Sequence, residues 1–152
     1  MPLPLSFYTG TYENSGYGSF TLCDPGSTSD YCIKVLGNFS SVDNAMDHLC
    51  RTKDIPQLFG AWPRLWSTHI RFIHFDSNEF NVSMTALFSM GYGLSKMPFE
   101  TFEMDQYAAR AEFVVEDNKI IGVGFFKTEG VDGMKGDGIP VQNPSTVWFA
   151  RL

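Results

Sequence analysis

Apolar and polar residues alternate along several short stretches of this chain, which is the pattern expected of half-buried β-strands. The clearest case is the stretch 79–88, where every even position is apolar and most odd positions are polar. Strands are also expected on either side of a turn at 14–16 within 6–24, and at 31–36, 58–65, 66–75, 98–104, 110–116, 119–126 and 145–152. Turn-forming residues separate these stretches at regular spacing. The pattern therefore predicts an all-β fold, a single antiparallel barrel of about eight strands.

One segment has helical spacing instead. Within 40–50, four apolar residues fall on one face at a period of about 3.6 residues, and Ser41 is placed to cap the first turn. These four residues are Val42, Ala45, Met46 and Leu49. We therefore expect one short helix in this segment. Asp117 and Asn118 are expected to close a hairpin, and the Gly-, Asp- and Pro-rich stretch 127–143 to form the longest loop.

The loop at 76–78 decides which side chains of the strand 66–75 face the barrel interior. A three-residue loop, with Asn78 in the left-handed region, pairs Phe75 with Glu79. The residues that this register turns inward are Trp66, Ile70, Phe72 and His74. A loop of two or four residues turns His69, Arg71 and Phe75 inward instead. We favour the three-residue loop because it buries more apolar side chain and leaves His69 and Arg71 as an exposed pair on the outer face.

Composition and charge narrow the range of functions. The 152 residues are 43% hydrophobic and 18% charged, which is typical of one globular domain spanning 1–152. The net charge is −6 and the basic residues are scattered, which argues against nucleic acid as a partner. No apolar run approaches the roughly 18 residues of a transmembrane helix, so we expect no membrane insertion. The first residues do not form a secretory signal, which favours a cytoplasmic location.

Three cysteines make one pair and one leftover residue. Cys23 and Cys32 flank a turn-rich segment that could bring their thiols together, while Cys50 would stay single. Without a secretion signal, free thiols are the expectation. The sequence has neither a CxxC motif nor a His/Cys pattern typical of a zinc site, so neither a metal nor another cofactor is expected.

Four stretches resemble a known family. The opening motif at 8–18, Tyr-Thr-Gly-Thr-Tyr-Glu-Asn-Ser-Gly-Tyr-Gly, and the stretches 66–71, 111–115 and 121–125 resemble the lipocalin-like C-terminal domain of serine β-lactamase-related, penicillin-binding-protein-like hydrolases, particularly fungal ones. The resemblance covers nearly the whole chain. It implies a small lipocalin-like antiparallel barrel, with catalysis in a separate domain that has a Ser-x-x-Lys nucleophile.

This chain contains no Ser-x-x-Lys, so we do not expect a serine hydrolase. It corresponds to the appended domain alone, either as a stand-alone protein with another use or as an excised domain. The resemblance also leaves a secreted location open.

Most of the candidate site residues lie in 62–75. His74, Arg71 and Tyr92 are the candidate catalytic residues, since an imidazole transfers protons near neutral pH and a guanidinium can hold an anion. The alternative for His74 is a histidine satisfied inside the barrel or at its mouth. The candidate ligand-binding residues are Trp62, Trp66, His69, Phe72, Met84 and Phe113. The acids most expected to approach the histidines are Glu100, Glu103 and Glu112.

Three hypotheses follow. The first is a barrel that binds a small hydrophobic molecule in an aromatic-lined interior. The second is a cofactor-free isomerase, cyclase or lyase acting on a hydrophobic metabolite, as part of a biosynthesis. The third is a structural or oligomerisation module of a larger hydrolase. A homodimer is compatible with all three.

Overall fold

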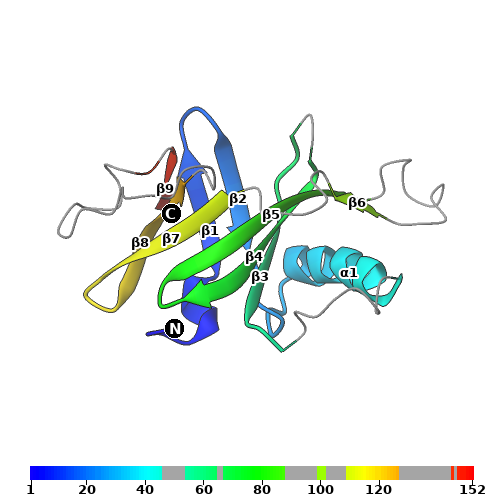
Figure 1. Ribbon diagram of the computed structural model, residues 1–152, viewed down its shortest axis with the longest axis horizontal. Coiled ribbons are helices and arrows are strands. Elements are labelled where there is room, and N and C mark those ends of the chain that lie inside the picture. The colour runs from blue at the N-terminus through cyan, green and yellow to red at the C-terminus, as the bar shows by residue number, and fades with distance from the viewer. Residues whose placement is uncertain (46–53, 65–66, 88–98, 102–108, 127–144, 146) are drawn as a thin grey trace.

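The computed structural model describes residues 1–45, 54–64, 67–87, 99–101, 109–126, 145 and 147–152. An antiparallel sheet curls into a nearly closed barrel, and an α-helix lies against its outer surface (Figure 1). The strand order around the barrel is β2-β1-β9-β8-β7-β5-β4-β3, and β6 pairs with β5 off this path. The predicted all-β barrel of about eight strands is confirmed.

The elements follow one another in this order: η1 Leu5–Tyr8, β1 Gly10–Asn14, β2 Gly18–Leu22, α1 Asp30–Ala45, β3 Gln57–Ala61, β4 His69–Asp76, β5 Glu79–Leu87, β6 Phe99–Thr101, β7 Ala109–Glu116, β8 Lys119–Phe126 and β9 Val147–Arg151. Among the described residues, no helix is long and apolar enough to cross a membrane. The predicted hairpin at Asp117 and Asn118 is confirmed, since both residues have positive φ angles, 49° and 60°.

The barrel closes where the end of β2 meets β3. The Cys23 N–H donates to the Phe59 carbonyl at 2.8 Å, and the Phe59 N–H donates to the Cys23 carbonyl at 2.9 Å. A Cβ atom on Gly60 would lie 2.7 Å from the Thr21 carbonyl oxygen. β2 and β3, the two ends of the strand order, can therefore approach each other only because residue 60 has no side chain.

The helix differs from its predicted position. The expected strand at 31–36 is wrong, because α1 already begins at Asp30. The expected start of the helix at residue 40 is wrong for the same reason. Apolar residues at helical spacing extend further upstream than predicted, at Val35, Phe39 and Val42. The Ser29 hydroxyl accepts the N–H of Cys32 at 3.2 Å, whereas Ser41 lies within the helix and donates to the Gly37 carbonyl. Met46 and Leu49 lie outside the described residues.

A disulfide ties the start of α1 to the end of β2. Cys23 and Cys32 are bonded, with their Cα atoms 5.6 Å apart. The expectation of free thiols is wrong for this pair, and Cys50 lies outside the described residues. The turn between them is fixed by Asp24 and Ser27, because the Ser27 hydroxyl donates to the Asp24 carboxylate at 2.8 Å.

The predicted register of β4 against β5 is confirmed in the strands and wrong in the loop. Ile70 pairs with Met84, Phe72 with Val82 and His74 with Phe80, so the even positions of β4 face inward. The turn itself has two residues, because Asp76 pairs with Glu79. A register irregularity between His74 and Asp76 absorbs the difference. The residue with a positive φ angle is Ser77, at 45°, and not Asn78.

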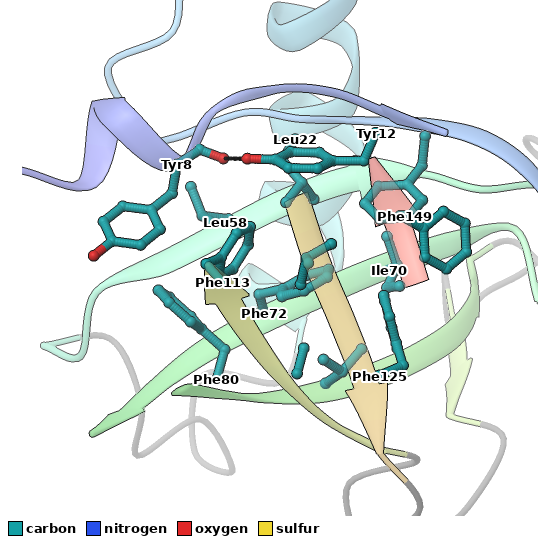
Figure 2. Packing of buried hydrophobic residues seen from close by; sticks show 14 of the residues in the cluster. Tyr8, Tyr12, Leu22, Leu58, Ile70, Phe72, Phe80, Phe113, Phe125 and Phe149 are labelled. Atoms are coloured by element: carbon teal, nitrogen blue, oxygen red, sulfur yellow. Dashed lines mark hydrogen bonds between the residues drawn. The ribbon is translucent and has the colours of Figure 1, made fainter. Parts of the chain in front are cut away.

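Aromatic side chains pack against one another in the described interior (Figure 2). Phe72 lies 5.8 Å from Phe113 and 5.7 Å from Phe125 between ring centroids. The short helix η1 covers one end of the barrel, where the Tyr12 hydroxyl donates to the carbonyl of Tyr8 at 2.8 Å. Both tyrosines are fully buried. The opposite end is the one at which the β1–β2 hairpin and the start of β4 lie.

Candidate functional site

The outer face of β4 is covered by α1. The expectation that His69 and Arg71 are exposed is therefore wrong, because Asn38 and Asp43 on α1 contact them. Their parity is as predicted, since both point away from the interior that Phe72 enters. We call this region, formed by His69, Arg71 and the side chains that contact them, the helix-covered face.

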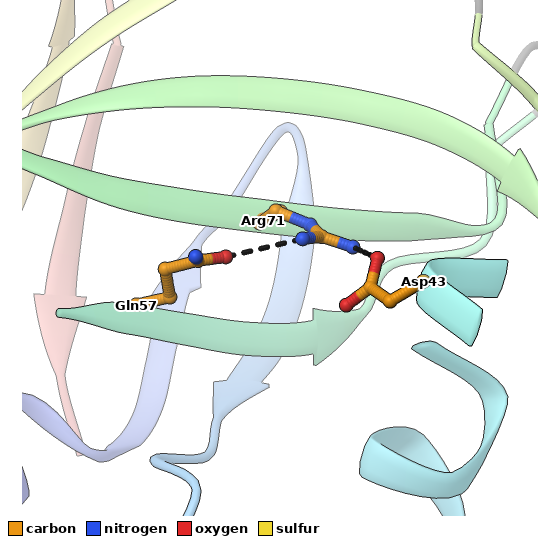
Figure 3. A network of polar contacts seen from close by, with 3 residues as sticks. All are labelled: Asp43, Gln57 and Arg71. Carbon is orange, nitrogen blue, oxygen red and sulfur yellow. Dashed lines mark hydrogen bonds and ion pairs between the residues drawn. The ribbon is translucent and has the colours of Figure 1, made fainter. Parts of the chain in front are cut away.

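Arg71 fastens the helix to the sheet (Figure 3). Its Nη2 lies 2.6 Å from the Asp43 carboxylate on α1, and its Nη1 donates to Gln57 Oε1 on β3 at 3.1 Å. The guanidinium carbon lies 4.9 Å from the ring centre of Phe39 and 5.3 Å from that of Phe59. Only 13% of the arginine side chain is exposed. These contacts give Arg71 a structural role between α1 and β3.

His69 is held neutral beside it. The amide Nδ2 of Asn38 lies 3.2 Å from His69 Nε2, and the Thr68 hydroxyl lies 2.8 Å from Nδ1. Since an amide NH₂ only donates, Nε2 accepts and the proton sits on Nδ1, which donates to Thr68. Burial lowers the pKa of His69 to about 4. An uncharged imidazole therefore links α1 to the sheet at neutral pH.

His74 lies at the end of the barrel that η1 covers. Its Nε2 lies 3.1 Å from the carbonyl oxygen of Ser77, and its ring meets that of Phe80 at 5.3 Å. Asn78, in the turn between β4 and β5, accepts a hydrogen bond from the Tyr8 hydroxyl of η1 at 2.6 Å. These contacts match the alternative in which the histidine is satisfied at the barrel end. His74 and Arg71 lie on opposite faces of β4, so the structure does not bring these two candidates together.

Phe72, Phe113 and Met84 are placed inside the barrel. Phe72 and Phe113 are buried, and Met84 is partly buried against the same core. Trp66, Tyr92 and Glu103 lie outside the described residues, and the side chain of Glu100 does as well. The carboxylate that meets a basic candidate is that of Asp43, which the sequence did not single out.

Trp62 lies at the other end of the barrel and belongs to its aromatic interior. The ring centroids of Phe20, Phe149 and Phe125 are 5.5, 5.7 and 6.3 Å from it. The guanidinium of Arg64 lies over the indole at 4.5 Å. Only 6% of the tryptophan is exposed. Trp62 therefore separates the arginine from the aromatic interior.

Three polar atoms at or near Trp62 are buried without a hydrogen-bond partner in the part of the chain that the structure describes. They are Trp62 Nε1, Arg64 Nε and Ser67 Oγ. An unsatisfied buried donor costs about 1–3 kcal/mol. Two further atoms share this condition, Arg110 Nε and Glu112 Oε2, but the side chains of these two residues make other contacts. We call Trp62, Arg64 and Ser67 the Trp62 turn.

Backbone hydrogen bonds hold the Trp62 turn together. The Trp62 N–H donates to the Thr68 carbonyl at 2.9 Å, and the Arg64 N–H donates to the Ser67 carbonyl at 2.6 Å. Arg64 also reaches across the barrel end, since a Cβ atom on Gly18 would lie 3.5 Å from its Nη2. Gly18 has a φ angle of 68°, which favours glycine. The arginine thus lies between the β3–β4 connection and the β1–β2 hairpin.

The sequence predicted Trp62 as a ligand-binding residue and missed Arg64 and Ser67. The available signal was the spacing of Trp62 and Arg64, two apart around Pro63, which places both side chains on one face of an extended segment. Among the described residues, His, Cys, Asp and Glu form no group of three that could hold a metal ion. Comparison of the chain with protein-family models, curated proteins and solved structures returns no match.

Proposed function

We propose that this barrel binds a small, predominantly apolar molecule at the end where Trp62 lies. The observation that supports this most is the Trp62 turn. An indole packed into the aromatic interior shares one short segment with buried polar atoms that have no partner among the described residues. Ligand sites are built in this way, from apolar walls with a few polar groups.

The contrast with the other candidates favours this end. His69, Arg71 and His74 each have hydrogen bonds within the protein that account for their side chains. A cofactor-free isomerase or cyclase that uses His74 and Arg71 together has less support, because the two residues lie on opposite faces of β4. We include in the proposal the relationship to the lipocalin-like domain of β-lactamase-related proteins, for which the motif at 8–18 is the main support.

The test is thermal unfolding with apolar probes that have dodecyl or naphthyl bodies. A probe at a hundred times its Kd stabilises a protein by about 2.7 kcal/mol, which is a rise in Tm of roughly 5–10 °C for a domain of this size. We expect at least one probe to give this rise with the wild type and a clearly smaller rise with Trp62→Phe. The matched control is Tyr8→Phe at the opposite end, which should keep the rise. If no probe shifts Tm, or if both variants behave alike, the proposal is wrong.

A further inference from the structure

We infer that the molecule bound at the Trp62 turn presents an anionic oxygen, as in a carboxylate, to Trp62 Nε1 and the guanidinium of Arg64. This inference rests on the proposed function and adds the chemical class of the ligand. It assigns the polar end of the ligand to the turn.

The first argument is the kind of atom that lacks a partner. An indole N–H and a guanidinium N–H can only donate hydrogen bonds, and a serine hydroxyl can donate as well. A site with such atoms is completed by an acceptor. A group that only donates, such as an ammonium, would leave the indole and guanidinium N–H atoms unsatisfied.

The second argument is charge. Arg64 has no carboxylate within ion-pair distance among the described residues, whereas Arg71 lies 2.6 Å from Asp43 and Arg110 lies 3.5 Å from Glu79. A guanidinium carries a positive charge and only donates hydrogen bonds. An oxygen that bears a negative charge can accept the hydrogen bonds of the guanidinium and also neutralise its charge. Such charge-assisted hydrogen bonds are about twice as strong as neutral ones.

The third argument is position. Arg64 stacks on Trp62 at 4.5 Å, and Trp62 in turn packs against Phe20 at 5.5 Å. A guanidinium and aromatic rings therefore meet at this end of the barrel, and a molecule with one charged end and an apolar body matches these two kinds of group. The net charge of the protein is −6, so it has no general attraction for anions. A preference for an anionic probe would therefore report this site.

The experiment compares three probes with the same apolar body, dodecanoate, dodecanol and dodecylammonium, by titration calorimetry below their micelle concentrations. We expect dodecanoate to bind roughly tenfold to a hundredfold more tightly than dodecanol, the gain of one or two charge-assisted hydrogen bonds. Dodecylammonium should bind most weakly. Arg64→Met should reduce the preference for dodecanoate to less than about threefold, and Trp62→Phe should reduce it in part.

The matched control is Arg110→Met. Arg110 also lies over an aromatic ring, that of Phe75 at 4.2 Å, but it is on β7 and is already paired with a glutamate. This variant should keep the full preference. Arg64→Lys, which keeps the charge and loses the planar donor pair, should keep only part of it.

The outcomes separate the two proposals. If dodecanol binds as tightly as dodecanoate, the barrel binds apolar molecules and the inference about the anionic oxygen is wrong. If dodecanoate is preferred but Arg64→Met and Arg110→Met behave alike, the anion lies elsewhere and the inference is wrong. If no probe of any apolar body binds, the proposed function fails and the inference fails with it. Since Arg64 is partly exposed, its replacement is expected to fold, as a thermal scan would check.

Discussion

The helix-covered face and the Trp62 turn come from neighbouring parts of the same segment, yet they differ in the hydrogen bonding of their buried polar side chains. On the helix-covered face, His69 and Arg71 are almost enclosed and each has two hydrogen-bond partners. In the Trp62 turn, Trp62 and Ser67 are equally buried and their polar atoms have no partner among the described residues.

The difference separates two reasons for placing a polar group inside a protein. A fully bonded buried network specifies how two elements pack, because any other arrangement breaks several bonds at once. Unpaired buried donors specify nothing within the chain and lower its stability. An acceptor outside the chain, such as a water molecule or a ligand, can complete them. The first region therefore contributes to stability, and the second is the one for which we propose binding.

The largest expected effect tests the helix-covered face. Arg71→Met should lower the free energy of unfolding by about 2–3 kcal/mol, because it leaves Asp43 and Gln57 without their shared cation. We take a value below the range for fully buried pairs, since 24% of the Asp43 side chain is exposed. Urea denaturation of wild type and variant measures the change.

Arg110→Met is the control for this measurement. Its ion pair with Glu79 is longer, 3.5 Å, and 29% of the arginine side chain is exposed. Surface pairs of this kind contribute about 1 kcal/mol or less. Equal losses for the two variants would show that Arg71 does not hold α1 on the sheet.

The next effect is a pH dependence of the same face. Burial lowers the pKa of His69 from 6.5 to about 4, so between these values the unfolded chain binds a proton that the folded protein does not. Stability therefore rises with pH through this window, is complete above about pH 6.5, and falls as the pH drops towards 4. Over the whole window the shift corresponds to at most roughly 3 kcal/mol.

The measurement is urea denaturation of wild type and His69→Gln at several pH values from 4 to 7.5. The carboxylates titrate in both proteins, so only the difference between the two curves reports the histidine. We expect the variant to be less stable at neutral pH and the gap to narrow on acidification. A gap that stays constant with pH would contradict the assignment of a neutral, buried His69.

Sequence reasoning was most accurate where a single periodicity decides the structure. The inner face of β4 was predicted correctly, because alternation in 79–88 fixes the register and Ile70 and Phe72 follow from it. The loop was wrong since an irregularity near Phe75 restores the register that a two-residue turn would otherwise shift. Local strand patterns do not reveal such an irregularity.

The exposure of the outer face of β4 was predicted wrongly because it depends on α1, an element far away in the chain. The sequence favours a strand at 31–36, whereas these residues belong to the same helix as Phe39 and the predicted Val42. Without that helix, nothing in the sequence covers His69 and Arg71. The Trp62 turn was half predicted, since burial of Trp62 follows from its type, while the missing partners of Arg64 and Ser67 are visible only in three dimensions.

The smallest expected effect compares two neighbouring hydroxyls across the boundary between the regions. The Thr68 hydroxyl accepts the Leu87 N–H at 3.0 Å and meets His69 Nδ1 at 2.8 Å. The Ser67 hydroxyl is buried without a partner among the described residues. Thr68→Val should therefore cost about 1–2 kcal/mol, because it leaves buried groups unsatisfied, whereas Ser67→Ala should be neutral or stabilising by up to about 1 kcal/mol.

Urea denaturation of the two single variants at neutral pH measures both changes, with the exposed Ser40→Ala on α1 as a control for the loss of a hydroxyl. The sign for Ser67→Ala is the decisive result. A loss as large as that of Thr68→Val would mean that the Ser67 hydroxyl already has a partner within the folded chain. The Trp62 turn would then be a bonded network like the helix-covered face, and its unpaired donors would no longer support a binding site there.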